Sequence, residues 1–430
     1  MGRGLYRLVV AGLILAVFLS GCAQPAPEKE KAPEKAPVKE VEIPLGVLVD
    51  LSGPLTTYGE DIKTTVTIAA ENVNSYFEKQ GKPYRVKLYV EDTKVDPKIA
   101  LDKVMALHGK GVKLVVGPMG SGEVRNILEY VRSNKIIIAS PSSTADPKYI
   151  GVTKPEEKKY VFRFVATDSF QTKAIAKLAA DRGVKALVIT HIGNAWGKGL
   201  EEFGKAEFQK LGIDVRSSVE YPDPPPADFT PYIATLEKTV QDMLKTYGKD
   251  EVAVVAFSYE EVATMLAQVK DDSVLLSVKW IGCDGTARSS KVIADVPDKA
   301  SKVKLYSTVS ETRGGAAFEE INKTYYARVG ATPKSYGLNA YDAAVVMALA
   351  FAEVYDKQGK YDADAMAETM PSVAEKYSRG DYGLAPVSGE VKLDEWNDRV
   401  GSEYVIYAVE DKNWKQVGVW EFSTNAIKWS

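Results

Sequence analysis

The sequence predicts an α/β fold of two doubly wound lobes, each built on a parallel sheet. A chain of 430 residues with 45% hydrophobic content is long enough to bury two large cores. From Val41 onward, strand-like apolar runs alternate with helical segments, the order typical of parallel sheets. After Tyr160-Val161-Phe162-Arg163 the same alternation starts again. We therefore expect two lobes of the same kind.

In the first lobe, short apolar runs are separated by amphipathic stretches of helical length. The expected elements are, in order, a strand at 43–49, a helix at 60–78, a strand at 85–90, a helix at 97–107, a strand at 112–116, a helix at 123–132 and a strand at 136–139.

The second lobe repeats this rhythm and leaves enough chain to cross back between the lobes. The Pro-rich run at 222–226 is interpreted as a rigid surface connection. We expect the first lobe to span 41–164 plus 309–387, and the second to span 165–308 plus 388–430. From residue 165 to residue 354, across both lobes, the expected elements are a helix at 171–181, a strand at 186–190, a helix at 199–211, strands at 252–257, 279–281 and 303–309, and a helix at 339–354.

The N-terminus has the pattern of a secretion signal. Arg3 and Arg7 precede an apolar run that leads into Leu19-Ser20-Gly21-Cys22. The run is shorter than the roughly 20 apolar residues of a membrane-spanning helix, and small residues before a cysteine resemble a bacterial-type lipobox. We expect residues 1–21 to be a signal peptide, Cys22 to carry lipid, and the Pro/Glu/Lys-rich segment 22–40 to be an extended tether.

Composition and motifs argue against nucleic-acid binding and catalysis. The net charge of −3 gives no field strong enough to attract nucleic acid. The two histidines, His108 and His191, have no second metal ligand or nucleophile at useful spacing. The glycine-rich run 117–122 lacks the ending of a phosphate-binding loop, and Cys283 is interpreted as a small buried residue. We expect no enzyme activity, no cofactor, no metal and no nucleic-acid partner.

Polar residues gather where strands of the first lobe are expected to end, at 51–54, 117–121 and 140–144. In open parallel sheets, ligands bind beyond the carboxyl ends of the strands. Helix N-termini there carry unsatisfied donors and partial positive charge, so adjacent turns make a receptor for a carboxylate. The alternative is that Ser121, Ser142 and Thr144 serve only as helix N-caps.

The strand ends of the second lobe offer aromatic rings and one acid instead. Trp196, Tyr259 and Asp284 follow three successive expected strands. If one lobe binds an anion and Asp284 binds a cation, a zwitterion such as an α-amino acid would bridge the lobes. The alternative reading of Asp284 is a turn residue or helix cap.

Together these motifs identify a family resemblance across nearly the whole chain after the tether. The sequence resembles the leucine/isoleucine/valine-binding receptors of ABC-type importers, which have the type I periplasmic fold. The resemblance implies two doubly wound lobes joined by a three-strand hinge, closing on a small-molecule ligand and delivering it to an ABC permease with ATP-binding subunits. The motifs are Gly46-Val47, Leu51-Ser52-Gly53-Pro54, Tyr58-Gly59, Asp92, Asp96-Pro97, Gly117-Pro118, Ser121, Ser140-Pro141-Ser142-Ser143-Thr144, Phe162-Arg163, Gln171 and Asp228-Phe229-Thr230.

In the first lobe, the resemblance implies an anion site. Ser121 and Thr144 stand where the family bonds the ligand carboxylate, with the backbone around Ser142 and Ser143 beside it. Tyr58 matches an aromatic position of the pocket. Ser142 and Ser143 replace small apolar residues of the family, which makes this wall more polar than an aliphatic ligand needs.

In the second lobe, the resemblance implies a cation site with aromatic walls. Asp284 stands where the family pairs an acid with the ammonium, and Tyr259 lies near the amino group. Trp196 of this lobe, and Tyr336 from the part of the first lobe expected at 309–387, match aromatic pocket positions. The leucine-type receptor has glutamate, tyrosine and phenylalanine where this chain has Asp284, Trp196 and Tyr336, so the ligand itself stays open.

Two alternatives to an amino-acid receptor stay open. One is a receptor of the same fold for an amide, urea, or an aromatic or aliphatic carboxylate. The other is a ligand sensor that signals through dimer rearrangement. In each case we expect an extracytoplasmic protein held at the membrane by its lipid.

Overall fold

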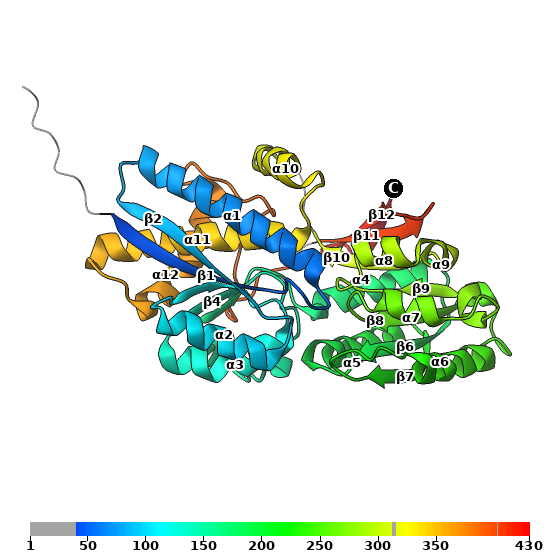
Figure 1. The fold of residues 1–430 in the computed structure, drawn as a ribbon. Helices are drawn as coiled ribbons and strands as arrows, with labels where there is room; N and C mark the ends of the chain where they lie inside the picture. The colour runs from blue at the N-terminus through cyan, green and yellow to red at the C-terminus, as the bar shows by residue number, and fades with distance from the viewer. Residues whose placement is uncertain (1–39, 312–314, 402) are drawn as a thin grey trace, which may run out of the picture. The chain divides into compact units, whose positions relative to one another are not determined.

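The computed structural model describes residues 40–311, 315–401 and 403–430. The expected signal peptide, Cys22 and nearly all of the tether lie outside the described residues. The described chain forms two sheets flanked by helices (Figure 1). Their strand orders are β2-β1-β3-β4-β5 and β13-β12-β11-β10-β9-β8-β6-β7. The predicted α/β fold of two doubly wound lobes is confirmed.

The first sheet is parallel throughout, and β1 lies near its centre. Leu45 of β1 pairs with Leu88 on one side and Leu114 on the other, and all the residues of β3 and β4 are buried. Such continuous burial explains why these strands are runs of apolar residues without polar alternation. The strands are β1 Val41–Val49, β2 Tyr84–Asp92, β3 Leu114–Val116, β4 Ile137–Ser140 and β5 Val161–Arg163.

Helices cover both faces of the first sheet. The chain moves in one direction from β1 to β2 and in the other from β2 to β3 and β4, so right-handed crossovers place the connecting helices on opposite faces. Figure 1 shows α1 and α11 on one face and α2 and α3 on the other, with α12 beside α11. These helices are α1 Thr56–Lys79, α2 Pro97–Gly109, α3 Ser121–Asn134, α11 Ser335–Gln358 and α12 Ala363–Arg379; the short 3-10 turns are η1 Pro147–Ile150 and η2 Pro155–Lys158.

Among the described helices, only α11 is long and apolar enough to cross a membrane by length and composition. Of its most apolar window, 94% is buried inside the fold. It packs along α1 and against β1, β3 and β4. Its apolar composition is therefore that of a core helix, because it is covered on nearly all sides.

The second sheet has a parallel part and an antiparallel part. Strands β6 and β8 are buried along their whole lengths and pair in parallel from Ala186 and Val252 onward. Strand β10 pairs in parallel with β9 and antiparallel with β11. The strands are β6 Ala186–Ile192, β7 Asp214–Tyr221, β8 Val252–Phe257, β9 Lys279–Ile281, β10 Tyr306–Ser310, β11 Glu403–Glu410, β12 Asn413–Glu421 and β13 Ala426–Trp429.

The helices of the second sheet follow the same crossover logic. The chain moves one way from β6 to β7 and returns past β6 to β8, which places α5 and α6 on opposite faces. Helix α4 packs against α5 and β10, and α10 contacts α1. The elements are α4 Asp168–Asp181, α5 Ala195–Lys210, α6 Thr230–Met243, α7 Val262–Gln268, α8 Ser290–Asp295, α9 Pro297–Lys302 and α10 Ala316–Val329, with 3-10 turns η3 Lys249–Glu251 and η4 Val274–Ser277.

The chain passes between the elements of the two sheets three times, in agreement with the predicted three-strand hinge. The first passage follows β5, the second follows β10, and the third lies between α12 and β11. The first and third run side by side: Arg163 N donates to Asn397 O at 2.9 Å, and Arg399 N donates to Arg163 O at 2.9 Å. This contact ties the end of β5 to the last passage of the chain.

The sequence reading did not identify strands β11 to β13. They form an antiparallel extension of the second sheet, with Trp420 fully buried and the Arg182 guanidinium 3.6 Å from the centre of the Trp429 ring. Of these three strands, only β11 has a continuous buried run, whereas β12 is only partly buried and β13 is largely exposed. Weak burial gives a weak hydrophobic signal, which explains why the pattern did not stand out.

Gly117 occupies a backbone position that only glycine fits. Its φ is +102°, and a Cβ atom there would lie 2.1 Å from the carbonyl oxygen of Leu48 in β1. The residue ends β3 and starts the loop that leads to α3. Close approach of β1 and this loop therefore depends on the missing side chain.

Replacing Gly117 with alanine should lower the free energy of unfolding by about 2–4 kcal/mol, through backbone strain and overpacking together. Gly111→Ala is the matched control, because Gly111 also has a positive φ, +82°, but open space around it. That variant should lose only about 1–2 kcal/mol, the cost of the left-handed backbone. Urea unfolding measures both; equal losses would contradict the proposed clash with β1.

Candidate functional site

One cavity lies where the strand-end loops of the two sheets meet. The space within its walls is about 300 Å³ when the open mouth is counted. Its walls come from loops after β1, β3, β4, β6, β8 and β9 and from the start of α11. The lining residues are Leu55, Met119, Gly120, Ser121, Ser142, Trp196, Tyr259, Asp284, Gly285 and Tyr336.

On the first-sheet side, serine hydroxyls fasten the loop after β4 to the loop after β3. Ser140 Oγ donates to Pro118 O at 2.6 Å, and Ser142 Oγ donates to Met119 O at 3.1 Å. In the other direction, Ala145 N donates to Ser121 Oγ at 3.1 Å. These bonds hold the two loops as one wall of the cavity.

Several donors of this wall have no acceptor in the described part of the chain. The backbone N–H groups of Ser142 and Thr144 make no hydrogen bond there, and the Thr144 hydroxyl makes no well-formed one. Ser121 Oγ lies 3.0 Å from Ser143 Oγ. If Ser143 donates in that pair, the Ser121 hydroxyl hydrogen is free as well. Unmatched donors at a buried wall suit an anionic group.

On the second-sheet side, a stacked aromatic pair forms a flat wall. The Trp196 and Tyr259 rings lie 4.6 Å apart with an interplanar angle of 15°. Asn194 fixes both, because its side chain caps Trp196 N at 3.1 Å and donates to Tyr259 OH at 3.2 Å. Gly285 allows the close approach, since a Cβ there would lie 2.9 Å from the Trp196 ring. The arrangement provides a rigid apolar surface.

Asp284 lies at the carboxyl end of β9, and elements of both sheets contact it. The Tyr336 hydroxyl donates to Asp284 Oδ2, while Asp284 Oδ1 makes no well-formed hydrogen bond in the described structure, although the Gln171 side chain is close enough to lower the pKa of the acid. Tyr58 OH donates to the backbone carbonyls of Asp284 at 3.0 Å and Ala287 at 2.5 Å. Burial raises the pKa of Asp284 above its usual range. A buried carboxylate with one free oxygen favours a cationic partner.

Asp168 is a second buried acid of the site, and the sequence reading missed it. It is fully buried in the first turn of α4, and neither carboxylate oxygen makes a well-formed hydrogen bond within the described structure. Burial raises its pKa well above the usual range, and the nearby charge of Asp284 adds to the rise. Gln171 Oε1, one turn along α4, is also unpartnered there. An acid in the first turn of a helix ordinarily interacts with the helix dipole. The position of Asp168 in the sequence therefore did not mark it as a site residue.

The nine predicted site residues divide into two groups. Six line the cavity: Ser121, Ser142, Trp196, Tyr259, Asp284 and Tyr336. The other three, Tyr58, Ser143 and Thr144, do not line it and lie behind its walls. Tyr58 packs on Tyr336 with ring centres 5.1 Å apart, and Ser143 contacts Ser121.

Cys283 and His191, two of the three residues weighed for catalysis, are both buried. Cys283 is fully buried, with its Sγ 3.6 Å from the Ser258 carbonyl oxygen, as expected of a small packing residue. His191 is buried at the end of β6, and burial lowers its pKa. No group of three or more acidic, cysteine or histidine residues with metal-binding geometry occurs in the described ranges.

Glu123 supports the cavity wall from behind. It is fully buried and accepts a hydrogen bond from Gly120 N at 2.6 Å, as the third residue of α3. Burial raises the pKa of its carboxyl to about 8. Glu123 thus fixes the backbone of Gly120, which lines the cavity, from inside the protein.

Sequence comparisons place this chain in a known family. Residues 42–413 match the family model described as periplasmic binding protein. An uncharacterized protein of Methanocaldococcus jannaschii is 46% identical over 97% of this chain and 98% of its own length. A Leu/Ile/Val-binding protein of Rhizobium johnstonii is 24% identical, covering 65% of this chain and 80% of that protein. A chemotactic signal transduction substrate-binding protein of Halobacterium salinarum is 25% identical over 80% and 78%.

Solved structures show the same fold. A leucine-binding protein of Thermotoga maritima superposes with a TM-score of 0.73 at 20% identity, over 89% of this chain and 99% of that one. A solute-binding protein of an ABC transporter from R. palustris, solved with benzoate, superposes with a TM-score of 0.68 at 16% identity, over 88% and 96%.

The raised pKa of Glu123 predicts a pH effect on stability. Between its usual value of 4.5 and the folded value of about 8, the folded protein keeps a proton that the unfolded chain releases. This group therefore makes stability fall as the pH rises through that window. Glu123→Gln cannot titrate, so its free energy of unfolding should fall less between pH 5 and pH 8 than that of the parent. Urea unfolding across this range measures the difference; parallel pH profiles would contradict the prediction.

Proposed function

Because the chain belongs to the periplasmic binding protein family, we propose that it binds an α-amino acid between its two sheets and delivers it to an ABC permease. The family consists of solute-binding receptors that work outside the cytoplasm, and it is not an enzyme family. The finer part of the proposal, the ligand class, rests on the chemistry of the cavity.

The opposed polarity of the two cavity walls carries the proposal. Unmatched donors at Ser142 and Thr144 lie on the first-sheet side, and an unmatched carboxylate oxygen of Asp284 lies opposite. The second buried acid, Asp168, lies beside Thr144, whose carbonyl oxygen accepts from Asp168 N at 2.8 Å. Buried polar groups without partners are costly, so the ligand is expected to supply both partners. An α-carboxylate accepts from the donors, and an α-ammonium, with three N–H groups, matches the acids.

The side chain of the ligand would then lie against Trp196 and Tyr259, with Leu55 and Met119 nearby. These residues offer aromatic, aliphatic and sulfur surface and no charge. An apolar or aromatic amino acid suits this wall better than one with a charged side chain. The Leu/Ile/Val-binding relative is consistent with this class.

We also propose that Cys22 carries the lipid that anchors the receptor. The support is in the sequence alone: a basic start, an apolar run and Leu19-Ser20-Gly21-Cys22, followed by a Pro/Glu/Lys-rich tether. An anchored receptor stays close to its permease while the tether allows it to move.

A receptor for a plain carboxylate is the second candidate, suggested by the relative solved with benzoate. Such a ligand would use the donors at Ser142 and Thr144 but leave Asp168 and Asp284 without a cation. Two buried acids beside an uncharged part of a ligand are unfavourable unless they take up protons. An α-amino acid as the ligand therefore accounts for more of the unpartnered groups of the site.

A thermal-shift screen tests the ligand class. The purified protein should be stabilised by one or more apolar α-amino acids, because a ligand at a hundred times its Kd adds about 2.7 kcal/mol to the free energy of unfolding. The corresponding amines and carboxylic acids, which carry one charged group each, should stabilise it less. Stabilisation by benzoate or another carboxylate alone would favour the second candidate.

Asp284→Asn tests the cation side. The amide keeps the size of the side chain and an oxygen for Tyr336, but it removes the charge that faces the ammonium. Affinity for the amino acid should fall by about 3 kcal/mol or more, the usual cost of unpairing a buried charge. Calorimetry measures it, with Asp295→Asn, an exposed acid of α8 paired with Lys291, as the control. Unchanged affinity in Asp284→Asn would argue against an ammonium at this site.

A further inference from the structure

The loop after β4 is held from behind by its backbone carbonyls. Asn339 Nδ2, on α11, donates to Pro141 O at 3.1 Å. Arg163 Nη1, at the end of β5, donates to Ser143 O at 3.3 Å and also to Ala145 O. Alternate carbonyls of this loop, at 141, 143 and 145, are therefore each bound by a side chain of the protein interior.

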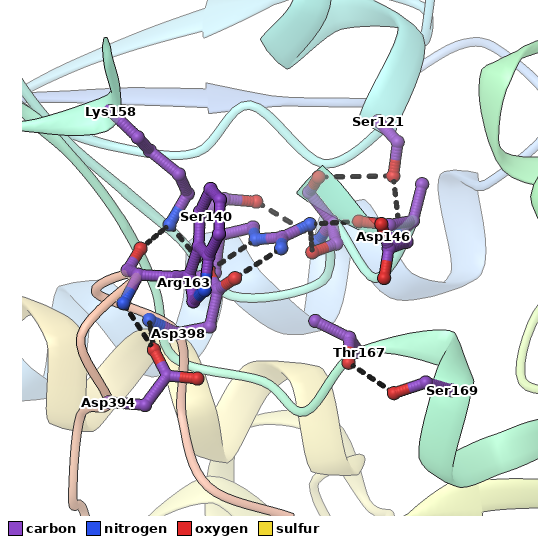
Figure 2. A network of polar contacts seen from close by, with 12 residues as sticks. Ser121, Ser140, Asp146, Lys158, Arg163, Thr167, Ser169, Asp394 and Asp398 are labelled. Carbon is purple, nitrogen blue, oxygen red and sulfur yellow. Dashed lines mark hydrogen bonds and ion pairs between the residues drawn. The ribbon is translucent and has the colours of Figure 1, made fainter. Parts of the chain in front are cut away.

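Two consecutive residues of the third passage hold these side chains in turn. Asp398 accepts two hydrogen bonds from the Arg163 guanidinium, through Nε at 2.5 Å and through Nη2. Arg399 Nη1 donates to Asn339 Oδ1 at 3.0 Å. Arg163 and Asp398 are almost completely buried, and Figure 2 shows them gathered with Lys158. The passage between the sheets thus reaches the loop by two independent routes.

The direction in which the loop carbonyls point fixes the direction of the loop N–H groups that have no acceptor. In a planar trans peptide, the C=O of one residue and the N–H of the next point opposite ways. When the carbonyls of residues 141 and 143 point to the interior, the N–H groups of Ser142 and Thr144 point away from it. These two N–H groups have no acceptor in the described structure, and Ser142 lines the cavity.

We propose that Arg163 and Asn339, held by Asp398 and Arg399, are positioning residues for the anion side of the ligand site. They orient the peptide units of residues 141–145 so that Ser142, which lines the cavity, presents its N–H group to a carboxylate, with the N–H group of Thr144 pointing the same way. This inference rests on the proposed function for the identity of the anion, but the orientation of the loop stands on the contacts alone. It also makes the interlobe passage part of the ligand site, because the loop and the passage share one buried network.

Two variants of one buried cluster separate positioning from general stability. Arg163→Met removes a buried cation that bonds both Asp398 and the loop. Lys158→Met removes a buried cation that bonds Asp398 at 2.5 Å and the Trp396 carbonyl, but it does not touch the loop. Asn339→Leu tests the second route and keeps Arg163 in place, so the proposal stays testable even if Arg163→Met folds poorly.

Amide hydrogen exchange gives a readout that needs no ligand. Exchange at residues 141–146 should accelerate at least tenfold in Arg163→Met and in Asn339→Leu, because Ser143 N and Ala145 N lose their fixed acceptors as the loop loosens. In Lys158→Met, faster exchange should be confined to the passage around residues 396–399. Loop exchange unchanged in both loop variants, or equally fast in Lys158→Met, would overturn the proposal.

Binding of L-leucine and of 3-methylbutylamine, the same molecule without its carboxylate, gives a second readout. Arg163→Met should weaken leucine binding at least tenfold and leave binding of the amine within about twofold, whereas Lys158→Met should change neither. Equal losses for both probes would overturn a role on the anion side. Failure of the parent protein to bind any α-amino acid would refute the proposed ligand class instead, and the exchange measurement would still decide the positioning role.

Discussion

The site depends on one constraint of parallel sheets: all strands of a sheet end at the same edge. A cavity between the first sheet and the parallel part of the second is therefore built from the loops that follow these strands and from nearby helix ends. The lining of this cavity obeys that rule, with contributions after β1, β3, β4, β6, β8 and β9 and from the start of α11. Three passages of the chain, with Arg163 pairing to residues 397 and 399, hold the two edges face to face.

Asp398 on the one hand, and Asp168 and Asp284 on the other, are buried acids that differ in how their charge is compensated. Asp398 receives both Arg163 and Lys158, and its pKa is lowered by their charges in spite of burial. Asp168 and Asp284, by contrast, have free oxygens and raised pKa values that follow from their burial. Unsatisfied acids destabilise the empty protein. Keeping them in a buried cleft lowers the stability of the fold in favour of binding, a conflict typical of functional sites.

The sequence predicted most strands of the parallel parts of the two sheets and six residues of the cavity lining, because both follow from local patterns. Apolar runs marked β6, β8 and β9, and turns directly after them carried Trp196, Tyr259 and Asp284. The same reasoning could not separate a residue that faces the cavity from one that lies behind it. Ser142 lines the cavity while Ser143 contacts Ser121, although they are neighbours in sequence, because a loop has no fixed period.

Asp168 shows a different limit of sequence reasoning. Its place in the first turn of α4 is common for an acid, and what makes it unusual is burial between elements that are distant in sequence. Only the assembled structure brings it near Asp284, 116 positions along the chain, and removes its partners. Likewise Glu123 resembles an ordinary capping acid in the sequence, and its raised pKa arises from burial that no local pattern encodes.

Asp284 links ligand capture to the contact between the two sheets. Tyr336 and Tyr58 belong to helices that pack on the first sheet, yet their hydroxyls bond the carboxylate and the backbone of the Asp284 loop. Where the resembled leucine-type receptor has phenylalanine, this chain has the hydroxyl of Tyr336. One oxygen of the acid therefore holds the two sides together without any ligand, and the other remains free. The acid that we propose pairs with an ammonium thus also contributes to the contact between the two sides, so a ligand bound there would need to order less of the site.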